Sequence, residues 1–480
     1  QTKPHYNGRT DVNQNNAMTA HEIIDFRPDL ITRYDKAGPR YTSYPTANLF
    51  NEQFGLDDYR DAAARSNLNN PKPLSLYFHI PFCDTVCFYC ACNKIVTKRR
   101  DRAIPYLEHL HREIAMQGEL YDKKRRVDQL HWGGGTPTFL SNEQMQALMT
   151  ETGRHFSLVD DDSGEYSIEI DPREIDPEGV HFLRSIGFNR LSLGIQDFDP
   201  VVQKAVNRIQ SEAVTFAAID AAREAGFKSV SVDLIYGLPF QTADSFIRTL
   251  DRVIQADPDR LSVFNYAHLP TLFMPQRRIN ADDLPSASEK LNILQAVIEY
   301  LTNKGYVYVG MDHFAKPDDE LVTAQEQGLL YRNFQGYSTH ADCDMVAMGV
   351  TGISMVDDVY SQNAKDEDSY YAMIDAGRIP VVRGMRLTKD DILRRELITE
   401  LNCNFRLEIK TFSDRYGIDF GSYFKDALEE LAVMQEDGLL DVSNELITVR
   451  PAGRLLIRNI CMAFDAHLKD KGEGRFSKVI

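Results

Sequence analysis

The chain has 480 residues, 43% of them hydrophobic and 26% charged, which is typical of a folded globular protein with more than one unit. Its formal net charge of −17 argues against a general binder of nucleic acid or of anionic membrane surfaces. No run approaches the ~18 consecutive apolar residues of a membrane span, so we expect none.

The first part of the chain precedes any regular pattern. Residues 1–17 are polar and are predicted to form a disordered extension, and Met18 is a candidate start. Residues 18–70 contain the stretch GPRYTSYPT at 38–46, which is too rich in turn residues for a helix. We therefore predict that 18–70 form an arm or lid lying across the main domain.

Between residues 71 and 385, strand-like apolar runs alternate with amphipathic helical patterns. The predicted strands are 74–80, 129–132, 166–171, 190–196, 229–236, 261–266 and 306–312. The predicted helices are 104–121, 142–156, 177–186, 211–225, 243–256 and 286–303. Strands separated by helices of this length indicate parallel βα units. The fold class is therefore predicted to be α/β, a partial (βα)6-type barrel that binds ligands at the carboxyl ends of its strands.

The pattern changes near residue 385. Residues 386–480 are predicted to form a smaller, mainly α-helical C-terminal domain. Its clearest helical segments are 424–435 and 455–468, and a short strand is expected at 447–450.

Seven cysteines are present, and four of them fall within ten residues. An odd number with this clustering suits a reducing compartment and a metal or redox site better than a disulfide framework. No charged-then-apolar signal segment opens the chain, and we expect a cytoplasmic protein.

Cys83, Cys87 and Cys90 have the spacing C-x3-C-x2-C directly after the first predicted strand. A structural zinc site would normally need a fourth ligand, often from a second cysteine pair, which the isolated Cys343, Cys403 and Cys461 do not supply. Iron–sulfur clusters are commonly held by four thiolates, so three would leave one iron of a [4Fe–4S] cluster open to a small molecule. A structural zinc loop is the alternative.

With Tyr89 between its last two cysteines, this loop resembles that of the radical S-adenosylmethionine (SAM) enzymes. Over residues 31–480 the chain is similar to the oxygen-independent coproporphyrinogen III oxidases of haem biosynthesis. The resemblance rests on GPRYTSYPT, LSLYFHIPFC, CACNKIVT, LHWGGGTPT, IEIDPREI, GFNRLSLGIQDF, VNR, DLIYGLP, DRLSVFNYAHLPT, GMDHFAKPDDEL, RNFQGY and GRLLIRNICM.

The resemblance implies an oxidoreductase with one [4Fe–4S] cluster bound by Cys83, Cys87 and Cys90. SAM would chelate the fourth iron and be cleaved to methionine and a 5′-deoxyadenosyl radical. In the family this radical takes a hydrogen from the β-carbon of a propionate, and loss of CO2 and one electron leaves a vinyl group. Two such reactions convert coproporphyrinogen III to protoporphyrinogen IX.

The resemblance also implies a set of SAM contacts. Gly134 belongs to the Gly-rich GGGTP turn, whose backbone can approach a ligand closely. Glu169 would accept hydrogen bonds from SAM, Tyr77 would contact it, and Ile353 would pack on its adenine. For His79, which shares a strand face with Tyr77, cluster support and a structural role are equally open.

A second ligand site is implied by residues that match the family. They are Tyr89, Gly135, Thr136, Gln196, Arg208, Asp233 and Ala267. Whether this site holds a second SAM or the porphyrinogen is left open, because a guanidinium such as that of Arg208 also pairs with substrate carboxylates. The candidate catalytic residues are Tyr77, His79, Cys92, Arg208 and Gln335.

Several further features have competing interpretations. Cys92 is an idle thiol or a functional one. The basic run 94–102 is favoured as a solvated face over a rim attracting propionates, whereas Arg40 is favoured as a guard of the substrate. His340 and Cys343 in THADCD depart from the family spacing; loop variation is favoured there over a second metal.

The partners expected are SAM, a porphyrinogen, and an electron donor and acceptor that the sequence does not identify. The resemblance implies a monomer. Two related functions compete with the main one: a haem chaperone that binds haem without this chemistry, and a haem-degrading methyltransferase. The chaperone relatives lack the GPRYTSYPT arm and the C-x-C-N-K sequence, both present here. A structural iron–sulfur or zinc protein would need none of the strand-end residues around Gln196 and Asp233.

Overall fold

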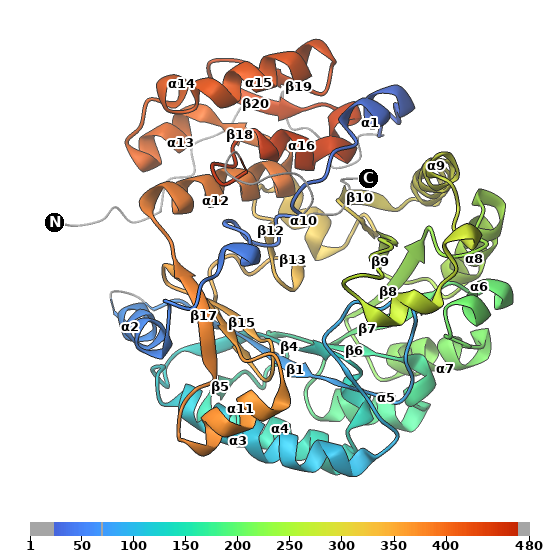
Figure 1. The fold of residues 1–480 in the computed structure, drawn as a ribbon, viewed down its shortest axis with the longest axis vertical. Coiled ribbons are helices and arrows are strands. Elements are labelled where there is room, and N and C mark those ends of the chain that lie inside the picture. The colour runs from blue at the N-terminus through green and yellow to red at the C-terminus, as the bar shows by residue number, and fades with distance from the viewer. Residues whose placement is uncertain (1–23, 69–70, 469–480) are drawn as a thin grey trace.

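A computed structural model describes residues 24–68 and 71–468 of the chain (Figure 1). The predicted extension 1–17 and the candidate start Met18 lie outside the described residues. No helix in the described ranges is long and apolar enough to cross a bilayer.

The centre of the molecule is a sheet whose parallel strands carry the site. They are β1 (Leu74–Ile80), β4 (Arg126–Gly134), β6 (Glu165–Ile170), β7 (Arg190–Gln196), β8 (Ser229–Tyr236) and β9 (Arg260–Asn265). These strands are hydrogen-bonded in the order β9-β8-β7-β6-β4-β1, each parallel to the next. On the far side of β1 lies β14 (Asp344–Met348), also parallel. The ends of the sheet do not pair with each other, so the predicted partial barrel is confirmed as an open one.

Six main helices connect the parallel strands and cover the outside of the curved sheet (Figure 1). They are α3 (Ala103–Gly118), α4 (Asn142–His155), α5 (Pro177–Ser185), α7 (Glu212–Glu224), α8 (Ala243–Gln255) and α9 (Ala287–Asn303). Capping explains several of their starts: Ser141, Asp176, Ser211, Thr242 and Ser286 each accept a backbone N–H of the first turn. Short pieces flank them: α6 (Pro200–Ala205) and β5 (Ser157–Leu158).

The strand predicted at 306–312 is present and runs in the same direction as β9, but it does not pair with β9, because another strand lies between them. It forms β10 (Val307–Gly310), which turns back through two residues into β11 (His313–Ala315). Both pairings of β11, with β10 and with β9, are antiparallel. A two-residue connection cannot cross over to a parallel neighbour, so a hairpin results.

An antiparallel extension beyond β14 has no counterpart in the sequence prediction. It consists of β15 (Ile353–Val356), β16 (Val359–Asn363) and β17 (Val381–Arg386), with α11 (Glu367–Asp375) before the last strand. The hairpin β12 (Tyr331–Asn333) and β13 (Gly336–Ser338) follows α10 (Glu320–Glu326). These strands are short, and their periodicity is too weak to be recognised without their partners.

The N-terminal segment contains two helices on either side of GPRYTSYPT, α1 (Pro28–Tyr34) and α2 (Leu56–Ser66). The GPRYTSYPT stretch itself has no α-helix, as predicted. Tyr34 donates to Asp437 at 2.5 Å, and Arg458 donates to the carbonyl of Pro39 at 2.9 Å. The segment is therefore packed between the C-terminal region and the sheet.

The C-terminal region is mainly helical, as predicted, and occupies the top of Figure 1. Its helices are α12 (Lys389–Asn404), α13 (Ile409–Tyr416), α14 (Phe420–Tyr423), α15 (Lys425–Glu436) and α16 (Ile457–Met462). A three-stranded antiparallel sheet joins β18 (Arg406–Glu408), β20 (Leu446–Val449) and β19 (Leu440–Val442). The helix expected at 455–468 is shorter, because the stretch from Pro451 to Leu456 is a 3₁₀ helix.

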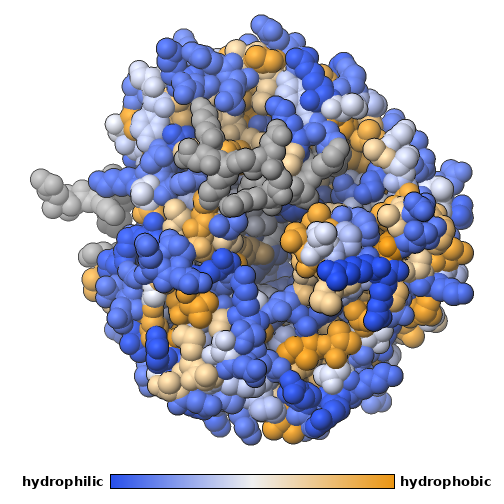
Figure 2. Space-filling model, viewed as in Figure 1, coloured by the Kyte–Doolittle hydropathy of each residue, from blue (hydrophilic) through white to orange (hydrophobic). Residues whose placement is uncertain are grey.

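One large hydrophobic core runs through the sheet and its helices, including the fully buried Trp132, Tyr106 and Phe188. The face seen in Figure 2 is mostly hydrophilic outside, with a hollow near its centre. The cysteine loop and the Gly-rich turn lie at the carboxyl ends of the parallel strands β1 and β4.

Candidate active site

The cysteine loop follows β1 and contains Cys83, Cys87, Cys90 and Cys92. Backbone and side-chain hydrogen bonds connect it to neighbouring segments of the chain. Within it, β2 (Phe82–Cys83) pairs with β3 (Ile95–Val96). The N–H of Phe88 donates to the Val206 carbonyl at 2.9 Å, and the Asn207 side chain donates to the Val86 carbonyl at 2.8 Å. Cys87 is buried, whereas Cys83 and Cys90 are half-buried. These contacts attach the loop to the segment that follows α6.

Two arginines approach the sulfur of Cys87. Arg208 Nη1 lies 3.6 Å from Cys87 Sγ and Arg173 Nη2 lies 3.7 Å from it. Both guanidinium groups also pair with Asp171, at 3.0 Å and 2.6 Å respectively. Burial raises the pKa of Asp171, but Arg208 and Arg173 outweigh it, and the pKa lies below its usual value. Positive charge is therefore concentrated around this thiol.

The other two thiols have donors of their own. Thr136 Oγ1 lies 3.6 Å from Cys83 Sγ. Hydrogen bonding from Cys92, together with Lys94, lowers the pKa of Cys90 to about 5 against the opposing effect of burial. Burial, opposed by Thr136 and reinforced by Cys90 and Cys87, raises the pKa of Cys83 to about 11. The three sulfurs therefore influence one another electrostatically.

These residues fit an iron–sulfur cluster. Three thiols face one region, and N–H and O–H donors already point at two of the sulfurs, as an anionic thiolate-bound cluster requires. In the described part of the chain, the sulfurs of Cys83, Cys87 and Cys90 do not all lie within 4.8 Å of one another, so they are too far apart to ligate one metal ion together. The exposed Cys92 lies in the same loop, two residues after Cys90.

The Gly-rich turn lies directly against the cysteine loop. Gly135 N donates to the Ile80 carbonyl at 2.8 Å, and Thr136 N donates to the Phe82 carbonyl at 2.7 Å. A Cβ on Gly134 would meet the His79 ring at 2.6 Å, and Gly134 has φ +115°. A Cβ on Gly133 would meet the Glu169 carboxylate at 2.9 Å. Only glycine permits this close approach of β4 to β1 and β6.

A carboxylate and three rings form the next layer. Glu169 accepts from Gly134 N at 3.2 Å and lies 3.2 Å from His131 Nε2. The His131 ring stacks on Tyr77 with centroids 5.8 Å apart, and Tyr77 Oη lies 3.1 Å from His79 Nδ1. Burial raises the pKa of Glu169, but His131 and Gly134 outweigh it and hold the carboxylate ionised.

Glu169 is nevertheless not sealed. Its side chain is 46% exposed, so the carboxylate faces open space at the strand end. His79 Nε2 lies 3.0 Å from the carbonyl oxygen of Asn93 in the cysteine loop. Glu169, His131, Tyr77 and His79 therefore connect the strand ends to the cysteine loop, and the Glu169 carboxylate is accessible to a ligand.

The predicted second site is partly assembled. Gln196 has φ +68°, and a Cβ on Gly194 would meet Gln196 Nε2 at 2.8 Å and Arg208 Nη2 at 3.1 Å. Arg208 Nη2 donates to the Gly194 carbonyl at 2.5 Å. Asp233 accepts from Ser192 at 3.1 Å, and burial with the nearby Glu169 raises its pKa to about 6. Burial, partly offset by Arg208, also raises the pKa of Tyr89.

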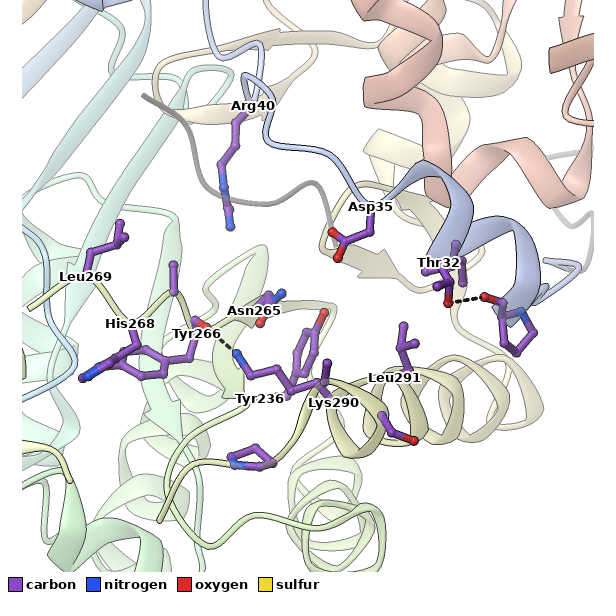
Figure 3. Close-up of a pocket in the computed structure, with 16 residues that line it drawn as sticks. Thr32, Asp35, Arg40, Tyr236, Asn265, Tyr266, His268, Leu269, Lys290 and Leu291 are labelled. Atoms are coloured by element: carbon purple, nitrogen blue, oxygen red, sulfur yellow. Dashed lines mark hydrogen bonds between the residues drawn. The ribbon is translucent and has the colours of Figure 1, made fainter. Parts of the chain in front are cut away.

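Ala267 lines a cavity of about 730 Å3. Figure 3 shows Arg40 on one side and Tyr236, Asn265 and Lys290 on the other. Arg40 Nη1 lies 3.1 Å from an Asp312 carboxylate oxygen, and Lys290 donates to the Tyr266 carbonyl at 2.9 Å. The N-terminal segment therefore forms one wall of a cavity whose other walls are strand ends and α9.

Two further predicted residues belong to antiparallel strands and their turns rather than to the parallel strand ends. Ile353 is on β15 and packs beside Phe50 and Tyr360. Gln335 is in the turn between β12 and β13, where its backbone N–H donates to Asn333 Oδ1 at 2.8 Å. Within the described residues, neither side chain hydrogen-bonds to the cysteine loop, and their predicted roles stay predictions.

Sequence reasoning missed two members of the site, His131 and Arg173. His131 precedes Gly133 by two positions on β4 and so shares its face, which is a signal that could have been used. Arg173 follows Asp171 by two positions, and its approach to Cys87 depends on the fold.

Comparison with known proteins accounts for this arrangement. A model of the radical SAM superfamily matches residues 77–253, and one of the HemN C-terminal domain matches residues 387–456. "Oxygen-independent coproporphyrinogen III oxidase" of Pseudomonas aeruginosa is 52% identical over 459 residues, covering 96% of this chain and all of that protein. The Escherichia coli protein of the same name is 51% identical over 458 residues, covering 95% of this chain and 99% of its own.

A solved structure gives the same result. It is described as "Coproporphyrinogen III oxidase (HemN) from Escherichia coli is a Radical SAM enzyme". It superposes with a TM-score of 0.89 at 50% identity, covering 93% of this chain and all of that one. The radical SAM superfamily implies a [4Fe–4S] cluster and SAM, which the cysteine loop fits. The chain belongs to the oxygen-independent coproporphyrinogen III oxidase family.

Proposed function

We propose that this protein converts coproporphyrinogen III to protoporphyrinogen IX without oxygen, by oxidative decarboxylation of two propionate side chains. Each propionate loses CO2, one hydrogen atom and one electron, and becomes a vinyl group. The observation that carries the proposal is the placement of three cysteines on one loop beside the ionised Glu169, at the carboxyl ends of parallel strands.

Cys83, Cys87 and Cys90 would hold the [4Fe–4S] cluster. The bound cluster and SAM together supply the radical that removes the propionate hydrogen. Arg208 and Arg173 offset negative charge at Cys87, and Thr136 donates toward Cys83. The hard chemistry belongs to the cofactor, and the chain orients it.

For SAM, Glu169 offers a carboxylate acceptor to its ammonium or hydroxyl groups. We assign Gly134 to SAM by family resemblance, and the Tyr77–His131 stack supplies an aromatic surface beside Glu169. We assign Ile353 to the adenine by family resemblance. Tyr77 and His79 share a hydrogen bond that can position a proton near the cysteine loop.

The number of SAM molecules is part of the proposal. Gln196, Arg208 and Asp233 surround a second ligand position, together with Tyr89, Gly135 and Thr136, and Gln196 Oε1 is buried without a hydrogen-bond partner among the described residues. A second SAM or a substrate propionate would satisfy such polar groups. Equilibrium dialysis with labelled SAM distinguishes them: two molecules per chain support a second SAM, and one supports the substrate.

The cavity beside Arg40 is the proposed entrance for the porphyrinogen. Its volume of about 730 Å3 lies within the usual range for ligand pockets. Arg40 is 37% exposed and can pair with a propionate carboxylate in place of Asp312. Arg40→Gln should raise KM for the porphyrinogen about tenfold and leave SAM affinity unchanged. An equal loss in both would contradict this role.

The central experiment uses anaerobic, cluster-loaded protein with SAM, coproporphyrinogen III and a chemical reductant. Release of two CO2 per porphyrinogen and formation of the divinyl product support the proposal. Tight haem binding with no consumption of the porphyrinogen would favour the haem chaperone instead. Formation of a methylated or ring-opened tetrapyrrole would favour the methyltransferase.

Four other predictions from the sequence belong to this proposal. They are the division into an arm (18–70), a barrel domain (71–385) and a C-terminal domain (386–480), the monomeric state, the cytoplasmic location, and external electron partners. Cys92 and Gln335 are proposed catalytic candidates on resemblance alone. Sedimentation of the cluster-loaded protein tests the monomer directly.

A further inference from the structure

A second group of metal-ligating side chains lies at the other end of the parallel strands, where the strands begin. His340, Asp342 and Cys343 each offer a ligand atom, and these atoms all lie within 4.8 Å of one another. They immediately precede β14, which runs parallel to β1, whereas the cysteine loop follows β1. Asp128, which is near this group, and Gly134, which is beside the cysteine loop, are six positions apart on β4, a distance of about 20 Å. The two groups are therefore well separated.

The thiol of Cys343 is buried and has no partner of its own. The residue is 5% exposed, and within the described ranges no hydrogen bond to its Sγ is present. Its Sγ nevertheless lies within 4.8 Å of a ring nitrogen of His340 and a carboxylate oxygen of Asp342. A buried sulfur this close to an imidazole nitrogen and a carboxylate oxygen is placed where it can act as a metal ligand.

His340 is oriented by a second carboxylate. His340 Nε2 lies 3.5 Å from Glu165 Oε2, at the start of β6. Gln129 Nε2 donates to Glu165 Oε1 at 3.4 Å and to Ser338 Oγ at 3.2 Å, and Ser338 Oγ accepts from His340 N at 3.0 Å. An imidazole that pairs with a carboxylate through one nitrogen can bind a metal through the other.

The surrounding charge also favours a cation. Asp128 acts electrostatically on both His340 and Cys343, together with Asp342. Lys72 is the basic group acting on Cys343, while Arg190 and Arg260 act on Glu165 and pair with Glu320. A divalent ion would neutralise the thiolate and the Asp342 carboxylate together.

We propose that His340, Asp342 and Cys343 form a binding site for a divalent transition-metal cation of the zinc class, outside the iron–sulfur site. The donors are one nitrogen, one oxygen and one sulfur, a set that suits Zn²⁺ and not Mg²⁺ or Ca²⁺. Three protein ligands leave the fourth tetrahedral position to water. The Cys343 thiol releases its proton to solvent when the cation binds. Because His340 also contacts Glu165, the ion connects the loop before β14 to the start of β6.

The test uses the cluster-loaded protein, kept anaerobic so that Cys83, Cys87 and Cys90 are occupied. One equivalent of ZnCl2 is added, and zinc K-edge X-ray absorption reports the zinc ligands without interference from iron. We expect one zinc per chain with one sulfur at about 2.3 Å and nitrogen or oxygen ligands at about 2.0–2.1 Å. A shell with several sulfurs, or with none, would overturn the proposal.

Variants locate the ion. Cys343→Ser should remove the sulfur shell, and His340→Gln should retain it but weaken zinc binding at least tenfold. The matched controls Cys403→Ser and His181→Gln change a buried thiol and an exposed imidazole elsewhere and should keep full affinity. If Cys343→Ser does not fold, His340→Gln decides alone. Unchanged zinc affinity in His340→Gln would refute the site.

Discussion

Arg208 Nη1 lies 3.6 Å from Cys87 Sγ and 3.0 Å from Asp171 Oδ2, although 121 residues separate the arginine from the cysteine. Arg208 is 6% exposed, so these contacts are shielded from water. A buried guanidinium that donates to a thiolate stabilises negative charge on the sulfur. The arginine therefore connects the proposed cluster ligand Cys87 with the proposed second ligand position.

Arg208→Lys should keep the charge but lose the fork that reaches Cys87, Asp171 and the Gly194 carbonyl together. We expect full iron content, a more negative cluster potential because a donor to sulfur is lost, and a roughly 10- to 100-fold slower turnover. An EPR-monitored redox titration measures the potential. Arg154→Lys, an exposed arginine on α4, is the control. An unchanged potential would contradict the role assigned to Arg208.

Cys90→Ser and Cys92→Ser should separate the cluster ligand from its neighbour. If Cys90 is a ligand and Cys92 is not, Cys90→Ser loses most of its iron and the cluster absorbance at about 400 nm. Cys92→Ser should retain both. Iron analysis and absorbance of anaerobically reconstituted protein check this. Iron loss in Cys92→Ser would show that the exposed thiol is itself a ligand.

Gly134→Ala should damage the SAM site. The φ of +115° is strained for alanine, and the new Cβ would stand 2.6 Å from the His79 ring. Strain of this kind costs on the order of 1–3 kcal/mol. We expect a lower melting temperature and at least tenfold weaker SAM binding by calorimetry.

Gly153→Ala on α4 is the matched glycine control. Its Cβ would meet only Leu158, at an ordinary 3.6 Å. Replacing glycine by alanine within a helix stabilises by roughly 1 kcal/mol, so this variant should melt no lower than the parent. If Gly134→Ala had the same melting temperature and SAM affinity as Gly153→Ala, the close contact between Gly134 and the His79 ring would not be needed for SAM binding.

Glu113 should make stability depend on pH. It is fully buried on α3, and burial raises its pKa to about 7 although Tyr370, Gly349 and Asn363 donate to it. Because the folded pKa exceeds the unfolded value, this group's contribution is complete below about pH 4.5 and is lost as the pH rises through 7.

Glu113→Gln removes that titration. A tenfold change in a proton-binding constant corresponds to about 1.4 kcal/mol. The free energy of unfolding of Glu113→Gln minus that of the parent should therefore increase by about 2–3 kcal/mol from about pH 5 to about pH 8. Urea unfolding across this pH range measures the difference. Glu108→Gln, at an exposed position of the same helix, should show no such change. A constant difference between variant and parent would mean that Glu113 does not titrate there.

Local patterns predicted most of the parallel sheet. The predicted strand 190–196 coincides with β7, and the helix predicted at 142–156 differs from α4 by one residue. Such segments carry their own periodicity and caps. At 306–312 only the pairing differs, because β11 lies between β10 and β9. Which strands pair depends on the connections and partners, which the pattern of a single strand does not contain.

The sequence by itself determined the chemistry available to this protein: three closely spaced thiols, a Gly-rich turn and acidic strand ends, since donor type and spacing are properties of the chain. Only the tertiary structure decided which charges meet these groups. It brought Arg208 to Cys87, His131 to Glu169, and Glu165 to His340. Those pairs join different strands and loops, and their distances follow from sheet order and packing rather than from any local pattern.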